Sequence, residues 1–182
     1  MAHTKTIEEL AELLLREVNC DSVPVPVDRI AKQLGARLRY APLDEELSGM
    51  IFIRDGTPII GVNSLHHSNR QRFTIAHEIA HLRLHPELIT SAVHVDKGFA
   101  VPVLRRDSLS AQGTEKLEID ANQFAAALLM PKRHLIAALA KLSGDIDDDE
   151  PLQDMARKFK VSVTSLHYRM RNLTSDIRKT KA

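Results

Sequence analysis

One helix constrains the fold of this chain more than any other segment. It spans residues 68–85, and it carries His-Glu-Ile-Ala-His at 77–81. Ser68 and Gln71 form a capping box at its start, and Pro86 ends it. Apolar side chains cover most of its circumference: Phe73, Ile75, Ala76, Ile79, Ala80, Leu82 and Leu84. A helix that is apolar on most sides is buried, so the rest of the chain must fold around this one.

The spacing of the polar residues in this helix predicts a metal site. Residues at i and i+4 lie one turn apart on one face, so His77 and His81 can reach a single ion. Glu78 lies about 100° further round and can act on a water without binding the ion. In such sites zinc activates the water and polarises a carbonyl, and the glutamate carries the proton to the leaving amine. The alternative is a pair of histidines that are hydrogen-bonded in the core. A buried helix is a costly place for two histidines and a glutamate unless they are paired or bound to a metal.

A catalytic zinc site needs a third protein ligand and an open position. A second helix, predicted over residues 115–130, offers Glu118 beside its apolar stripe, with the amide of Asn122 one turn later. Spacing favours Glu118 but leaves Glu115 and Asp120 as alternatives. Zinc is the expected ion, although two histidines and a glutamate also suit Mn²⁺ or another divalent ion.

The segments before the metal helix predict an α+β fold with a small, mainly antiparallel sheet. Thr6 and Glu9 form a capping box for a first helix, and a short second helix ends at Gly35. Strand patterns occupy residues 36–40, 50–53 and 58–62, and Asp55-Gly56 predicts a hairpin between the last two.

After the metal helix the pattern is more varied. It predicts an extended excursion over 91–104, a polar loop over 108–114, and a helix that Pro131 opens and Gly144 closes. The core would therefore span residues 1–144. An acidic linker follows at 145–150, where five of six residues are carboxylates.

Residues 151–182 predict a helix-turn-helix segment, with eight Lys or Arg against two acids. DNA binding is one interpretation. Lys160 departs from the pattern, since this turn usually carries glycine. We expect these helices to pack on the core or grip a protein substrate, with residues 178–181 as a frayed tail.

Composition excludes several other classes of protein. The 182 residues suit one domain with a small appended module, and the net charge of +1 gives no general bias towards nucleic acid or membranes. The single cysteine, Cys20, excludes an intramolecular disulfide and a cysteine-based zinc finger. We find no signal sequence and no apolar run of membrane-spanning length, so we expect no membrane contact and a cytoplasmic location.

Substrate contacts are less sharply predicted. Peptides often add a strand to a sheet edge, and residues 48–53 offer one, with Met50 and Phe52 as contact candidates. His66 and His67 are interpreted as loop residues. No oxyanion donor can be assigned among the six chemically suitable residues, which are Tyr40, His85, His94, His134, His167 and Tyr168.

Two motifs carry a family resemblance: R-Q-R-F-T-I-A-H-E-I-A-H at 70–81 and E-I-D-A-N-Q-F-A-A-A-L-L-M-P at 118–131. With them, nearly the whole chain resembles the ImmA/IrrE family of bacterial metallopeptidases. The resemblance implies a zincin-like, gluzincin-type core with His77, His81 and Glu118 as metal ligands.

The same resemblance implies a function. Members of this family cleave helix-turn-helix repressors of the XRE type and so release mobile-element or stress-response genes. We therefore expect a zinc-dependent endopeptidase with such a repressor as its protein partner. The alternatives are a DNA-binding regulator or toxin–antitoxin-type partner with a structural metal site, and a zinc hydrolase acting on a small molecule.

Overall fold

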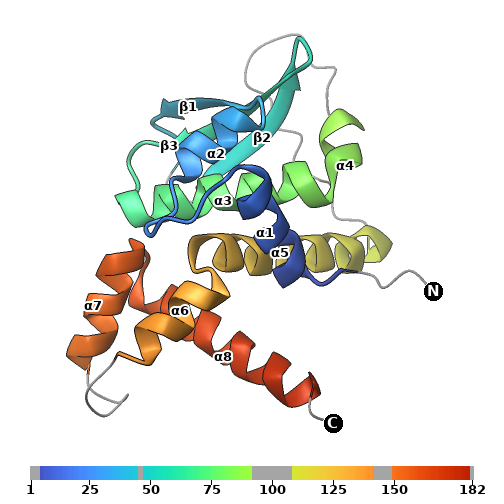
Figure 1. Cartoon of the computed structure of the whole chain (residues 1–182). Coiled ribbons are helices and arrows are strands. Elements are labelled where there is room, and N and C mark those ends of the chain that lie inside the picture. The colour runs from blue at the N-terminus through green and yellow to red at the C-terminus, as the bar shows by residue number, and fades with distance from the viewer. Residues whose placement is uncertain (1–4, 45–46, 92–107, 142–148, 181–182) are drawn as a thin grey trace.

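The computed structural model describes residues 5–44, 47–91, 108–141 and 149–180. A three-stranded sheet, helix α3 (Ser68–Leu84) and helix α5 (Ser108–Leu129) lie in successive layers, with α3 in the middle (Figure 1). Helices α1 (Ile7–Glu17) and α5 pack together. The mixed α+β class is as predicted. No helix in the described part of the chain is both long and apolar enough to cross a membrane.

The sheet has the order β1-β3-β2, built from β1 (Arg37–Ala41), β2 (Gly49–Arg54) and β3 (Thr57–Asn63). The β2–β3 pair is the predicted hairpin, with φ of 51° at Asp55 and 73° at Gly56. Positive φ at both turn residues is typical of a type I′ turn.

The expectation of a mainly antiparallel sheet is only half right, because β1 and β3 are parallel. After β1 the chain leaves one place in the sheet empty, forms β2 beyond it, and returns through the hairpin to fill that place with β3. A strand that reverses twice runs in its original direction, so β3 is parallel to β1.

Gly49 allows β2 to lie directly on the central helix. A Cβ atom at this position would come within 2.3 Å of Thr74 Cγ2 and 2.6 Å of the Gly61 carbonyl oxygen. Any larger residue would push the strand away from α3. The lack of a side chain at Gly49 therefore allows the sheet to pack closely against the helix that carries the two histidines.

The predicted capping box at the start of α3 is wrong. The N-cap is His67, whose Nδ1 accepts a hydrogen bond from the Asn69 amide at 3.2 Å. The Gln71 side chain instead donates to the carbonyl oxygens of Ser64 and His66, at 3.1 and 2.8 Å. The preceding loop lies within reach of Gln71, and its carbonyl groups take the place of the expected partner.

The end of α3 is as predicted: the C-cap His85 has φ −136° and ψ 46°, outside the helical region. A short helix, α4 (Pro86–Ser91), follows directly. Ser91, expected to begin an extended excursion, is therefore helical. The remainder of that excursion, residues 92–104, lies outside the described residues.

The predicted polar loop at 108–114 is also wrong, because α5 begins at Ser108. Adding a residue to an existing helix is far easier than starting one, so the apolar part of α5 can extend into a polar sequence that lacks proline. Helix α6 (Lys132–Leu139) has Pro131 as its N-cap. It ends before Gly144, which lies outside the described residues.

The C-terminal segment is a helix-turn-helix of α7 (Asp149–Phe159) and α8 (Val163–Thr180). The first two residues of α7, Asp149 and Glu150, were expected in the acidic linker. Lys160 in the turn has φ 53°, the left-handed conformation for which glycine was expected. Residues 178–180, expected to fray, belong to α8.

A buried ion pair ties this segment to the rest of the protein. The guanidinium of Arg169 on α8 donates to both carboxylate oxygens of Glu8 on α1, at 2.5 and 2.6 Å, and to the Met130 carbonyl at 3.1 Å. Arg169 is only 3% exposed. At the turn between α7 and α8, Asn69 Nδ2 donates to the Val161 carbonyl at 3.1 Å.

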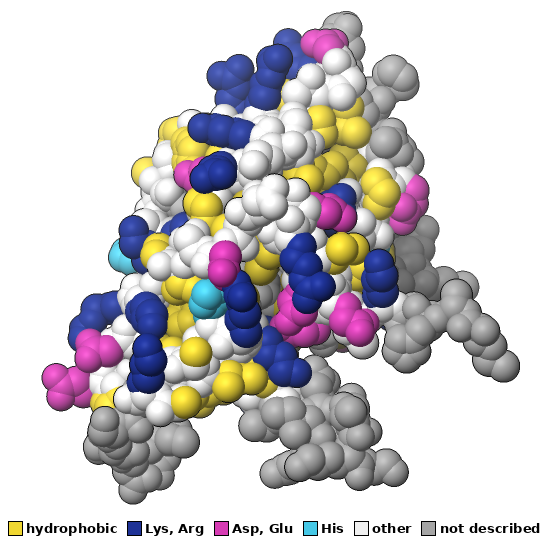
Figure 2. All heavy atoms as spheres, viewed as in Figure 1, with side chains coloured by type: hydrophobic (Ala, Val, Ile, Leu, Met, Phe, Trp, Pro, Cys, Tyr) yellow, Lys and Arg dark blue, Asp and Glu magenta, His cyan; other side chains and the backbone are white. Residues whose placement is uncertain are grey.

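On the face of the molecule that Figure 2 shows, basic and acidic side chains are interspersed.

Candidate metal centre

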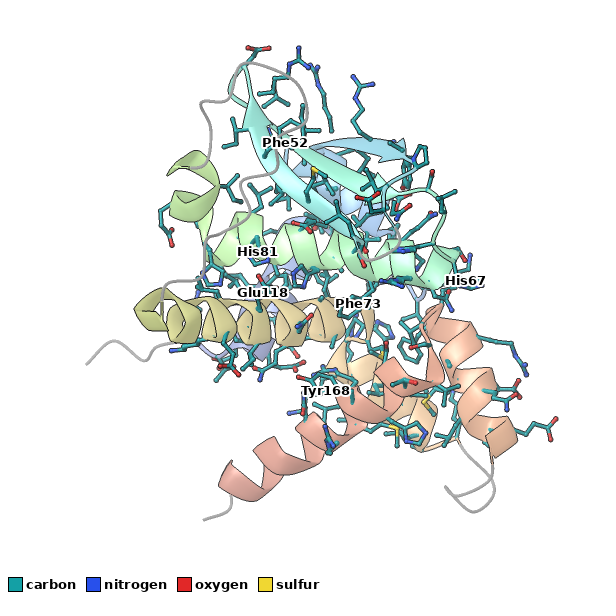
Figure 3. All side chains as sticks on the ribbon, turned by 180° about the vertical axis from the view of Figure 1, so that it is seen from behind. Phe52, His67, Phe73, His81, Glu118 and Tyr168 are labelled. Carbon is teal, nitrogen blue, oxygen red and sulfur yellow. The ribbon has the colours of Figure 1, made fainter. Side chains whose placement is uncertain are left out.

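The pairing of α3 with α5 brings the predicted metal ligands together. His77 and His81 lie one turn apart on α3, and Glu118 lies on α5. Figure 3 shows His81 and Glu118 facing one another between the two helices. Among the described residues, these three are the only group of His, Cys, Asp or Glu side chains arranged closely enough to hold an ion.

The distances between the donor atoms fit a tetrahedral ion. His77 Nε2 and His81 Nε2 are 3.0 Å apart. Glu118 Oε2 lies 3.2 Å from His77 Nε2, and Oε1 lies 3.4 Å from His81 Nε2. Ligand atoms that each lie about 2.1 Å from a tetrahedral zinc ion are separated by roughly 3.4 Å. The three side chains therefore lie close enough to share such an ion, with the two imidazole nitrogens slightly nearer one another than an ideal tetrahedron requires.

Asn122 fixes the orientation of the first histidine. Its Oδ1 lies 3.1 Å from His77 Nδ1, and an amide oxygen can only accept, so His77 donates from Nδ1. The lone pair of the neutral ring is then on Nε2, the atom that faces His81 and Glu118. This is the arrangement by which outer groups orient the histidine ligands of metals.

Glu78 lies beside this group but is much less accessible, with 7% exposure against 48% for the Glu118 side chain. Burial raises the pKa of Glu78 to about 7, and the Glu118 charge acts in the same direction, while His77 opposes it. A carboxyl group that titrates near neutral pH can both take up and release a proton under working conditions.

The three candidate ligands also influence one another. Burial, followed by the charge of His77, lowers the pKa of His81 to about 4. When its ring is protonated, His77 can also donate from Nε2 to Glu118, and this hydrogen bond is the largest influence on Glu118 and lowers its pKa. At neutral pH, therefore, Glu118 is ionised and His81 is neutral, which are the protonation states in which these groups bind metals.

The other carboxylates of α5 do not join the group. Glu115 is exposed on the preceding turn, and Asp120 is partly buried, but neither belongs to the three-residue cluster. Of the three carboxylates that spacing alone left open, Glu118 is the one that lies with the two histidines among the described residues.

His85 is the one described oxyanion-donor candidate that adjoins the cluster. Its ring centroid lies 5.9 Å from that of His81, and its buried Nε2 has no hydrogen-bond partner among the described residues. Tyr168 lies on α8, and His67 caps the opposite end of α3 (Figure 3). His134 contacts Asp21 at 2.7 Å. His94 lies outside the described residues.

Strand β2, which carries Met50 and Phe52, is an edge of the described sheet, as the peptide-binding hypothesis requires. Phe52 lies in the layer on the other side of α3 from Glu118 (Figure 3). Both residues are partly exposed. Their contact with a substrate stays a prediction.

Fold and site together define an α+β, metallopeptidase-like domain with a two-histidine, one-carboxylate cluster between its central helices. The chain belongs to the Peptidase_M78 family, described as the IrrE N-terminal-like domain, whose model matches residues 31–171. This agrees with the resemblance carried by the two helical motifs.

One solved structure similar to this chain is a Mycobacterium tuberculosis transcriptional regulator, with 21% sequence identity and a TM-score of 0.60. The match covers 90% of this chain and 45% of that one, so this chain spans less than half the length of the regulator. At this identity the likeness concerns the fold. No curated protein matches the chain.

Proposed function

We propose that this protein is a zinc-dependent endopeptidase, in which His77, His81 and Glu118 hold the ion and Glu78 is the general base. The supporting observation is the convergence of two imidazole nitrogens and one carboxylate at 3.0 to 3.4 Å, next to a buried glutamate. A structural zinc site usually has four protein ligands and requires no neighbouring base.

Each residue of the site has a distinct part in the proposed reaction. Zinc bound there would supply Lewis acidity, lowering the pKa of water and polarising the scissile carbonyl. Glu78 takes a proton from the attacking water and delivers it to the leaving amine. Asn122 keeps the His77 ring in its ligating orientation, and the half-exposed side of Glu118 leaves access for a peptide.

For the substrate, we propose an XRE-type repressor, whose cleavage would release mobile-element or stress-response genes. This step rests on family membership, because members of the family cleave such repressors. The experiment is to incubate the zinc-loaded chain with XRE-type repressors of the same genome and to follow cleavage by mass spectrometry.

Glu78→Gln tests the enzymatic role directly. We expect cleavage to fall by about 10²- to 10⁴-fold, the usual contribution of a general base, while zinc affinity stays within a few-fold. The matched control is Glu115→Gln, the same change on an exposed glutamate of α5, which should cleave normally. Full cleavage by the Glu78 variant would contradict the proposal.

The edge strand is the proposed binding place for the peptide. Replacing Phe52 with proline should slow cleavage at least tenfold, because a proline blocks strand addition. A chelator titration in the same samples checks that zinc remains bound, and Phe52→Leu serves as the control. Unchanged cleavage by the proline variant would exclude β2 as the docking edge.

The alternative is a DNA-binding regulator or toxin–antitoxin-type partner with a structural metal site, and the helix-turn-helix of α7 and α8 is the observation that favours it. Arg157, Lys158 and Lys160 are exposed there, whereas Arg169 is committed to Glu8. A mobility shift with duplex DNA that weakens steeply with salt would support this alternative. No shift at low salt would remove it.

A further inference from the structure

A cavity of about 850 Å³ lies outside the metal-site cluster, where α2 (Val27–Gln33), β1, the first turns of α3 and the α7–α8 turn meet. Arg72 and Ile75 line it from α3. Ile75 projects about 200° around the helix from His77, so the cavity and the metal-site cluster use different faces of α3. None of the three candidate ligands lines the cavity. Its volume is within the range of small-molecule sites.

The charged side chains around this cavity are strongly biased towards one sign. Five are basic and only one is acidic: Arg29, Lys32, Arg72, Arg157 and Lys160 against Asp28. Figure 2 shows Lys and Arg side chains on the left of the view, over α7 and the neighbouring part of the molecule, with a few acidic side chains among them. Positive charges around a concave surface create a positive potential that attracts anions.

Three of the basic side chains are available to a ligand. Arg29, Lys32 and Lys160 form no ion pair with any residue that the structure describes. Arg157 instead contacts Asp154. Arg72 is fixed in the wall, since its Nη2 donates to the Val25 carbonyl at 2.8 Å and its Nε to the Lys160 carbonyl at 3.4 Å.

The cavity also has an aromatic side chain. Tyr40, on β1, is 48% exposed although it is large and apolar. Burial, followed by the charge of Asp28, raises the pKa of Tyr40, so the acid of the lining lies close to the Tyr40 hydroxyl. Pro24, Pro26 and Ile75 supply further apolar lining. A ligand here meets an exposed aromatic ring together with basic side chains that form no ion pair with the described residues.

We propose that this cavity binds a nucleotide-like ligand, with its phosphate groups on Arg29, Lys32 and Lys160 and its planar base against Tyr40. Guanidinium and ammonium groups are the usual partners of phosphate, and an aromatic ring stacks on any base. This combination, within a concave wall, distinguishes the cavity from an ordinary solvated basic surface. The proposal is independent of the metal centre.

Isothermal titration of the whole 182-residue chain with ADP, GDP and inorganic pyrophosphate tests this assignment. We expect both nucleotides to bind with one-to-one stoichiometry and pyrophosphate to bind more weakly, because it lacks the base. The double variant Arg29→Ala, Lys32→Ala should lose at least tenfold in affinity for all three probes. Its control is Arg16→Ala, Arg54→Ala, which removes the same charge outside the lining and should bind as the unmodified protein does.

A second variant separates the contribution of the base to binding from that of the phosphate groups. Tyr40→Ala should weaken ADP binding by about tenfold, as expected for the loss of one stacked base, and leave pyrophosphate binding unchanged. The proposal is overturned if no probe binds at millimolar concentration, or if the lining variants bind as tightly as the control. It is also overturned if duplex DNA competes for the same residues more strongly than the nucleotides do.

Discussion

Two clusters of polar side chains join helices that are distant in the sequence, and they are built on opposite principles. On α8 and α1, Arg169 meets Glu8 in a closed, bidentate ion pair, and the guanidinium also donates to Met130. Between α3 and α5, two imidazole nitrogens and the Glu118 carboxylate converge on one point, and the carboxylate is half exposed.

The two clusters show how a structural polar cluster differs from a ligand site. In the first cluster every charge meets its opposite, so nothing further is required for stability. In the second, electron-pair donors face one another at distances that suit a shared cation. Four changes test this contrast, and the largest effect is expected for the closed ion pair.

Breaking the ion pair should affect folding most. Glu8→Gln leaves Arg169 buried without its counter-charge, so we expect a loss of about 3 to 5 kcal/mol in the free energy of unfolding. Glu12→Gln, on the exposed pair with Arg16, is the control and should change it by less than about 0.5 kcal/mol. Urea denaturation measures the free energy of unfolding of both variants. Zinc affinity of the folded Glu8 variant should be unchanged.

A compensated double variant tests the same pair further. Glu8→Leu with Arg169→Met should recover most of the lost stability, because replacing both buried charges with apolar groups is often neutral. If the double variant is no more stable than Glu8→Gln alone, the ion pair stabilises the fold by more than mutual neutralisation of two buried charges.

Zinc should stabilise the protein only through the second cluster. At a free zinc concentration about 100 times the Kd, we expect a gain of about 2.7 kcal/mol in the free energy of unfolding. Glu118→Ala should abolish most of this gain, while costing little stability when a chelator is present, since Glu118 is half exposed. Calorimetry of each protein, once with zinc and once with chelator, gives the gain from zinc and the stability without it. An equal gain in the variant would disprove the assignment of this ligand.

The smallest expected effect concerns Asn122. Asn122→Ala removes the acceptor for His77 Nδ1, so zinc affinity should fall about 10- to 100-fold, as is usual for partners of metal ligands. Gln123→Ala, the neighbouring amide, should leave affinity within a few-fold. Competition with a chromophoric chelator measures both, and equal affinities would show that the hydrogen bond does not orient the ring.

Much of the local structure was predictable from the sequence. The Thr6–Glu9 capping box, the Asp55-Gly56 hairpin and the end of α3 before Pro86 appear as expected. Each depends on contacts within a few residues, which the sequence displays directly. The failures are also local: His67 replaced the expected cap, and α5 extended through 108–114, because surrounding structure outweighed a weak local preference.

Other features left no signal in the sequence. Glu8 and Arg169 are separated by 161 positions, and neither belongs to a motif. The basic cavity draws its lining from four parts of the chain. Three of them contribute only one or two ordinary Lys or Arg residues each, and β1 contributes Tyr40. Spacing alone could not choose among Glu115, Glu118 and Asp120 either, and the family resemblance was needed to do so.

The sequence alone places His77 and His81 on one helix face, because the separation of residues within one helix is fixed by helical geometry. The approach of Glu118 to these histidines and the enclosure of the basic cavity appear only in the folded molecule. The rotation and translation of one helix against another depend on how the whole core packs, and no short stretch of sequence encodes that.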